Sequence, residues 1–108
     1  MCLKADFDAA IYNYKKTIDY DPYNAPAFYN LGNAYYMKNE FEKAIFAYNS
    51  ALKLNPDSAE CHFNIASAYN DKGDFDNALK HYRQSLQYDP KNSETYVNIG
   101  AILEKRSF

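Results

Sequence analysis

Hydrophobic and polar positions in this chain recur with a period of 34 residues. One set of columns is Phe7, Phe41 and Phe75; Ala10, Ala44 and Ala78; Tyr14, Tyr48 and Tyr82; and Pro22, Pro56 and Pro90. A second set is Phe28, His62 and Tyr96; Asn30, Asn64 and Asn98; Leu31, Ile65 and Ile99; and Gly32, Ala66 and Gly100. So many columns in one register indicate a solenoid built from a repeated unit.

Each unit contains two amphipathic helical patterns. Phe28, Leu31, Gly32 and Tyr35 follow the i, i+3, i+4, i+7 spacing of one helix face. The next segment keeps that spacing at Phe41, Ala44, Ile45, Tyr48, Ala51 and Leu52. We therefore predict an all-α fold with helices at about 5–20, 25–38, 41–54, 59–72, 75–88 and 93–105.

The predicted boundaries carry capping and turn residues. Asp21-Pro22, Asn55-Pro56 and Asp89-Pro90 end the second helix of each unit, because proline lacks an N–H and restricts the residue before it. Two residues later, Asn24, Ser58 and Asn92 are suited to N-cap the next helix. Inside the pairs, Gly73 is suited to a left-handed C-cap with Asp74 as the following N-cap, and Asn39 and Glu40 fill these places less well. Small residues at Gly32, Ala66, Gly100, Ala44 and Ala78 are expected to let paired helices approach closely.

These motifs resemble the tetratricopeptide repeat. The run Phe28-Tyr29-Asn30-Leu31-Gly32-Asn33-Ala34-Tyr35 matches aromatic-x2-Leu-Gly-x2-Tyr with Phe in place of the usual Trp, and Ala-x3-aromatic and Pro follow. The resemblance implies a right-handed superhelix of about six antiparallel helices in one domain, 1–108. Its parts are a partial repeat at 1–24, full repeats at 25–58 and 59–92, and a partial repeat at 93–108. His62 and Ala66 depart from the pattern.

Composition and charge exclude several classes of function. The formal net charge is −2, so the basic footprint that a nucleic acid requires is missing. No apolar run approaches the roughly 18 residues of a membrane span. The first residues, Met1 to Asp6, are too few and too acidic for a signal peptide. Cys2 and Cys61 form no disulfide framework, so we expect an intracellular and cytoplasmic protein.

The sequence favours no catalytic centre, metal or cofactor. Cys61 and His62 are adjacent, and neighbours in a helix point about 100° apart, so they cannot form a nucleophile–base pair. His62 stands in the aromatic core column. His81 has no second metal ligand at i+4. We expect a protein that is not an enzyme.

The predicted first helices carry the candidate binding surface. Residues 25–37 contain no charged side chain, and their outer face holds Pro26, Tyr29, Asn30, Asn33, Tyr36 and Met37. Amides, phenols and a thioether suit contact with another chain better than solvent. The resemblance implies that first helices line a concave, ligand-binding groove. The candidate groove residues are Tyr29, Asn30, Asn33, Tyr36, Met37, Glu60, Phe63, Asn64, Ser67, Asn70, Val97 and Asn98.

Three columns organise this groove. They are Tyr29, Phe63 and Val97; Asn30, Asn64 and Asn98; and Asn33, Ser67 and Ala101. A row of amides can bond the backbone of an extended peptide, and the row is similar to the asparagine ladder of the O-linked N-acetylglucosamine transferase. The same side chains could instead link adjacent helices. If the amides bind a peptide, we expect Asn64 to be exposed and dispensable for folding.

The resemblance also suggests which peptides to exclude. Chaperone-docking members grip an acidic tail with a clamp of Lys and Asn, then Asn, then Lys and Arg. The matching positions here are Tyr29 and Asn33, then Asn64, then Glu94 and Asn98, so every cation is missing. Glu60, Asp71 and Glu94 make the groove mildly acidic, and we expect a neutral or basic peptide from a partner protein.

Three functional hypotheses remain open at this stage. The chain is a scaffold that binds a peptide segment of a partner, a structural segment of a longer array, or the targeting region of a larger enzyme such as a glycosyltransferase. The last helix keeps apolar residues at Tyr96, Ile99, Ile102 and Leu103. Because arrays normally end in polar capping helices, we expect self-association or helix exchange through the terminal helices.

Overall fold

Six α-helices make up most of the protein. A computed structural model describes residues 6–106, without the side chain of Arg106. The helices are α1 (Phe7–Tyr20), α2 (Ala25–Met37), α3 (Phe41–Leu54), α4 (Ala59–Lys72), α5 (Phe75–Tyr88) and α6 (Ser93–Arg106). The predicted helix boundaries agree with these within two residues. The parts of the predicted domain that fall on residues 1–5 and 107–108, including Cys2, lie outside the described residues.

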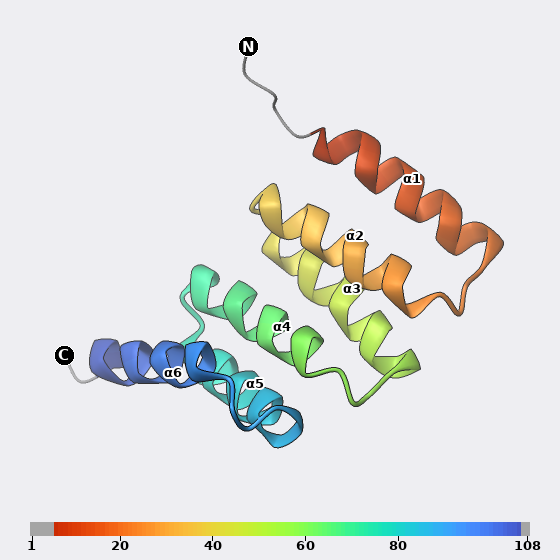
Figure 1. Ribbon diagram of the computed structural model, residues 1–108. Coiled ribbons are helices and arrows are strands. Elements are labelled where there is room, and N and C mark those ends of the chain that lie inside the picture. The colour runs from red at the N-terminus through yellow and green to blue at the C-terminus, as the bar shows by residue number, and fades with distance from the viewer. Residues whose placement is uncertain (1–5, 107–108) are drawn as a thin grey trace, which may run out of the picture.

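Consecutive helices run antiparallel and stack from one end of the molecule to the other (Figure 1). The pairs α2–α3 and α4–α5 are the two complete helix–turn–helix units. The helix α1 packs on α2 as the second helix of a unit, and α6 packs on α5 as the first helix of a unit. We call α2, α4 and α6 the first helices and α1, α3 and α5 the second helices. This arrangement confirms the all-α, antiparallel fold that the repeat predicts.

The predicted caps form as hydrogen bonds. Asn24, Ser58 and Asn92 accept from the backbone N–H of Ala27, Cys61 and Thr95 at 3.0, 3.1 and 3.3 Å. The turn between α4 and α5 uses Gly73 at φ +88°, and the turn between α2 and α3 uses Asn39 at φ +64°. Asp74 caps α5, but Glu40 makes no side-chain cap bond to α3. Asn39 and Glu40 are therefore the weaker version of the same turn, as predicted.

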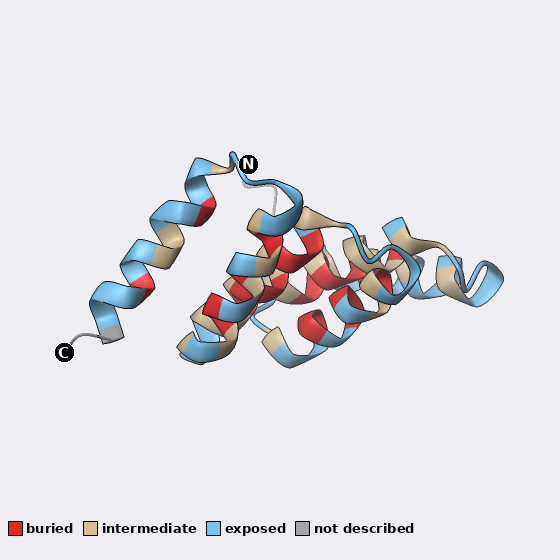
Figure 2. Cartoon of the chain, turned by 90° about the horizontal axis from the view of Figure 1, so that it is seen from below, coloured by how far each residue is buried: buried red, intermediate tan, exposed pale blue. Residues whose placement is uncertain are grey.

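The core runs between the paired helices. Ala44, Tyr48, Ile65, Ala66 and Ala78 have no exposed surface at all. The small residues allow the close packing, because a Cβ on Gly32 would lie 2.6 Å from the ring of Tyr48. The buried residues accordingly concentrate in the middle helices, whereas the helix at the C-terminal end is mostly exposed (Figure 2).

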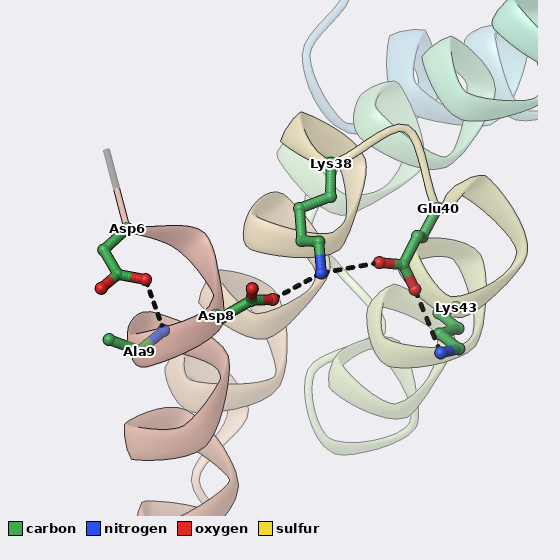
Figure 3. A network of polar contacts seen from close by, with 6 residues as sticks. All are labelled: Asp6, Asp8, Ala9, Lys38, Glu40 and Lys43. Carbon is green, nitrogen blue, oxygen red and sulfur yellow. Dashed lines mark hydrogen bonds and ion pairs between the residues drawn. The ribbon is translucent and has the colours of Figure 1, made fainter. Parts of the chain in front are cut away.

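An ion-pair network closes the corner between α1, α2 and α3 (Figure 3). Lys38 at the end of α2 contacts Asp8 of α1 and lies 3.1 Å from Glu40, which also pairs with Lys43 at 3.0 Å. These hydrogen bonds raise the pKa of Lys38 and lower the pKa of Glu40. All of these groups are at the surface, so the network fixes the helix corner without contributing much stability.

The terminal helices are incompletely covered. In α6, Ile102 is fully buried against α5, so only part of the apolar set of this helix is open. The face that would pack against a second helix is open, because Tyr96 is 54% and Leu103 is 43% exposed. No helix among residues 6–106 is long and apolar enough to cross a membrane.

Candidate functional site

The first helices α2 and α4 are joined by a polar network on the face that carries the candidate groove residues. Asn64 of α4 donates through Nδ2 to the hydroxyl of Tyr29 at 2.9 Å and to Oδ1 of Asn33 at 3.2 Å. The hydroxyl of Tyr48 donates to the same Asn33 oxygen. Both N–H donors of Asn64 are thus used within the protein, and Oδ1 is the Asn64 atom left to accept from a ligand.

This network changes the expectation for Asn64. The residue is half-buried rather than exposed, and its two bonds tie α4 to α2. Burial raises the pKa of Tyr29, with a smaller contribution from the nearby carboxylate of Glu60, so the phenol stays neutral and can accept this bond. Asn64 therefore links adjacent helices, whether or not it also contacts a ligand.

The next unit, α4–α5, carries related polar and aromatic contacts made by different groups. The hydroxyls of Ser67 and Tyr82 lie 3.0 Å apart, and Phe63 meets the Tyr82 ring edge-on at 5.4 Å between centroids. Burial raises the pKa of Tyr82, and hydrogen bonds to Ser67 and Asn98 offset part of that rise. Burial likewise raises the pKa of Tyr48 and a hydrogen bond to Asn64 lowers it, so Asn98 and Asn64 occupy equivalent positions beside these tyrosines.

A second link between α2 and α4 lies about two helical turns beyond the Tyr29–Asn64 bond. The hydroxyl of Tyr36 donates to Oδ2 of Asp71 at 2.5 Å. Burial, together with this carboxylate, raises the pKa of Tyr36, so the phenol keeps its proton as a donor. Met37, next in sequence, projects outward with 64% of its surface exposed.

A hollow of about 250 Å³ opens between the N-terminal ends of α4 and α6. Four candidate residues line it together, namely Tyr29, Glu60, Phe63 and Asn64. The rest of the lining is Ala59, Asp89, Asn92 and Glu94. Three carboxylates and two aromatic rings thus surround one opening that contains no cationic side chain, and such a site suits a positively charged group with an apolar stem.

The other candidate residues are distributed along the same helices. Asn30, Asn33 and Met37 line a separate hollow of about 430 Å³ beside α1. Ser67 and Asn70 are half-buried on α4, and Val97 is 67% exposed on α6. The structure therefore gathers part of the predicted set at the α4–α6 hollow and leaves Asn30 facing the opposite end.

The two histidines form a stack of rings rather than a reactive pair. The centroid of the His62 ring lies 5.8 Å from that of His81 and 5.9 Å from that of Tyr88, and Tyr69 stacks on His81 at 5.6 Å. Burial lowers the pKa of both histidines, that of His81 to about 4. Burial also raises the pKa of the Cys61 thiol, which makes it a poorer nucleophile. No cluster of three metal-ligating side chains occurs within residues 6–106.

The sequence interpretation missed the ion pairs that join successive units. Lys72 of α4 pairs with Glu42 of α3 at 3.4 Å, at the position in the repeat where Lys38 pairs with Asp8 one unit earlier. The signal was in the sequence, because acidic residues recur at Asp8, Glu42 and Asp76, and basic residues at Lys38, Lys72 and Arg106. Both columns keep the 34-residue period, and they place opposite charges 30 residues apart.

Comparison with known families places this geometry among repeat proteins. The family model described as TPR repeat matches residues 4–39, 32–73 and 66–106, which is nearly the whole chain. No curated protein matches the sequence.

Several solved structures share the fold. A crystal structure of the MamA protein is 30% identical over 94% of this chain, with a TM-score of 0.89, and this chain spans 55% of its length. The first TPR of Spaghetti (RPAP3), bound to the HSP90 peptide SRMEEVD, is 27% identical over 94% of this chain and 81% of its own, with a TM-score of 0.90. The Yersinia enterocolitica type III secretion translocator chaperone SycD, in an alternative dimer, is 16% identical over 94% and 83%, with a TM-score of 0.89, which shows the fold alone.

Proposed function

The chain belongs to the tetratricopeptide-repeat family, and from this we propose that it is a scaffold which binds a peptide segment of a partner protein along its first helices. The observation that carries the proposal is the α4–α6 hollow, where Tyr29 and Phe63 stand beside Glu60, Asp89 and Glu94. Aromatic rings in a partly enclosed site provide apolar contact, and the carboxylates select the charge of the ligand.

The same hollow favours a basic segment over an acidic one. The peptide bound to the first TPR of Spaghetti, SRMEEVD, contains three acidic residues. Acidic side chains entering the hollow of this chain would meet three carboxylates without a neighbouring cation. Like charges at that distance repel, whereas an arginine or lysine could place its stem on the rings and its charge among the carboxylates.

Binding of this kind requires no chemistry from the protein, and we propose none. The Cys61 thiol is buried with a raised pKa, and the His62 ring is stacked on His81 and Tyr88. The half-buried amides and phenols of α2 and α4 act as a rigid wall of the groove, because they are already bonded to one another. A preformed wall lowers the entropy lost on binding.

Selection from a library of random linear peptides tests the proposal. We expect enriched peptides to carry Arg or Lys next to an apolar residue. A selected peptide should bind Glu60→Lys and Glu94→Lys about ten-fold or more weaker in fluorescence anisotropy. Asp19→Lys, which makes the same charge change at an exposed position of α1, should bind as the unmodified chain does. A library that yields no enriched peptide, or only acidic ones, would overturn the proposal.

A further inference from the structure

The terminal helices present the two halves of one helix pair. Among the described residues, α6 packs on α5 but lacks the second helix of its own unit, and α1 packs on α2 but lacks the first helix of its own unit. Gly100 of α6 stands at the repeat position of Gly32, and Tyr14 of α1 stands at the position of Tyr48. By repeat position, Gly100 of α6 and Tyr14 of α1 therefore match the two residues that pack together in a complete unit.

The complete units show how such a pair closes. In α2–α3, the ring of Tyr48 lies where a Cβ on Gly32 would be only 2.6 Å away, and Tyr48 and Ala44 have no exposed surface. In α4–α5, Ala66 and Ala78 are fully buried around Tyr82, which is 1% exposed. A small residue on the first helix and a tyrosine on the second helix are thus the closing contact of both units.

The same face of α6 is open. A Cβ built on Gly100 meets no atom within 4 Å, although the same test at Gly32 finds the Tyr48 ring. Tyr96, one turn before Gly100, is more than half exposed. The close approach that a small residue permits is therefore unused at this position.

The matching face of α1 borders a cavity. Phe7, Ala10 and Tyr14 are only partly buried, whereas the equivalent Ala44 and Tyr48 are completely buried. These three α1 residues line the hollow of about 430 Å³. Its other walls are Asp6 and the α2 residues Asn30, Asn33, Ala34 and Met37. The hollow thus lies at the place where a first helix preceding α1 would pack.

We propose that α6 of one copy of this chain packs into the α1–α2 hollow of a second copy, so that Gly100 and Tyr14 of the second copy form the contact that Gly32 and Tyr48 form within one chain. The partner is a second copy because both halves of the interface lie on this chain. They cannot meet within one molecule, since α1 and α6 are at opposite ends of a body 44 Å long (Figure 1).

Association of this kind is head-to-tail and open-ended. Each contact uses α6 of one copy and α1 of the next, so every assembly keeps one free face of each type and continues to grow. The interface is also weaker than the packing between complete units. Val97 and Ala101 stand at the positions of Tyr29 and Asn33, so the two hydrogen bonds of Asn64 have no counterpart across the junction. The average mass should therefore rise gradually with concentration.

Substitutions on either face should block the contact without disturbing the isolated chain. Gly100→Leu extends into open space in the monomer, but it occupies the position of the Tyr14 ring in the assembly. A leucine is needed because Ala66 shows that a methyl group is accommodated at this position of the repeat. Ala10→Leu fills the hollow from the other side. Ala9→Leu is the matched control, since Ala9 is exposed on another side of α1.

Sedimentation and light scattering across a concentration series give the result. The unmodified chain and Ala9→Leu should exceed the monomer mass of 12.5 kDa progressively. Gly100→Leu and Ala10→Leu should each stay monomeric, yet their equimolar mixture should form a dimer of twice that mass that grows no further, because each variant retains one intact face. Circular dichroism establishes that the variants are folded, and Tyr96→Arg replaces Gly100→Leu if that variant is not.

Three results would overturn the proposal. The first is an unmodified chain that remains at monomer mass at every concentration. The second is continued association of Ala10→Leu alone, which would indicate a symmetric contact between two α6 helices. The third is a mixture of the two blocked variants, both folded, that stays monomeric.

Discussion

The ring of Tyr48 lies directly against the backbone of Gly32, and no side chain separates them. This contact sets the distance between α2 and α3. The same residue type at Gly100 has no such neighbour. Gly32 and Gly100 therefore occupy the same repeat position but have different neighbours. The same substitution at both sites measures how much the packing of a complete unit depends on the contact with Tyr48.

We expect opposite effects on stability from one substitution at these two sites. Gly32→Leu should overpack the α2–α3 pair and lower the free energy of unfolding by about 1–3 kcal/mol. Gly100→Leu should raise it by about 0.5–1 kcal/mol, because leucine is a better helix former than glycine. Urea unfolding at a concentration where the chain is monomeric measures both. Equal losses at the two positions would mean that the Tyr48 contact is not what decides the effect.

Removal of Asn64 should destabilise the fold. Asn64→Ala removes the donor to the Tyr29 hydroxyl and one of the two donors to Oδ1 of Asn33, at a cost of about 1–3 kcal/mol. The Tyr48 hydroxyl still donates to Asn33 in this variant. Asn30→Ala is the matched control, because Asn30 belongs to the same column but makes no side-chain hydrogen bond within the described residues. The measurement is again the free energy of unfolding in urea, and a loss at Asn30 as large as that at Asn64 would contradict the linking role.

Stability should fall with mild acid because of the histidine stack. The pKa of His62 and that of His81 are lowered in the folded state, that of His81 to about 4. As the pH falls below about 6.5, the unfolded chain takes up protons that the folded chain excludes, so the free energy of unfolding decreases towards pH 4. Above about pH 6.5 the two histidines cause no decrease in the free energy of unfolding. The Nδ1 atoms of both rings are buried without a hydrogen-bond partner, and Lys80 adds repulsion at His81.

Unfolding in urea between pH 7.5 and pH 5 checks this expectation. The stack should account for a decrease on the order of 1–2 kcal/mol once partial solvent screening is included. His81→Phe keeps a ring in the stack and removes the proton acceptor, so it should flatten the pH dependence over this range. An unchanged slope in that variant would assign the acid sensitivity to other groups.

The surface ion pairs should matter little. Lys38→Ala removes the contacts to Asp8 and Glu40 and should lower the free energy of unfolding only slightly at low salt, because solvent screens exposed ion pairs. The difference should vanish near 1 M salt, where charges are screened within about 3 Å. Lys53→Ala, at an exposed position of α3 without an ion pair among the described residues, serves as the reference. A large, salt-independent loss would show that the Lys38 stem is packed rather than paired.

Most of the fold was predictable because the repeat determines which residues share a column. Pro22, Pro56 and Pro90 fixed the helix ends, and the left-handed turn at Gly73 followed from the residue type alone. Even the weaker turn at Asn39 was predictable, since asparagine tolerates a positive φ at some cost.

Contacts between successive units were less predictable. They depend on the rotation from one unit to the next, which a periodic pattern does not contain. The sequence placed Asn64 on the groove face, but the bonds to Tyr29 and Asn33 depend on where α2 lies relative to α4. For the same reason, the repeat pattern did not show which apolar residues of the last helix are covered, and Ile102 is buried by α5. The stacking of His62 on His81 also depends on packing between helices.

The order of the helices has a topological consequence. The six described helices begin with a second helix and end with a first helix, so they contain the parts of three complete hairpins in a cyclically shifted order. A circular permutant that starts at α2 and continues from α6 into α1 would close Gly100 against Tyr14 within one polypeptide. The same residues would then form a molecule that begins with a first helix and ends with a second helix. Connectivity, with composition held constant, would determine whether the chain polymerises.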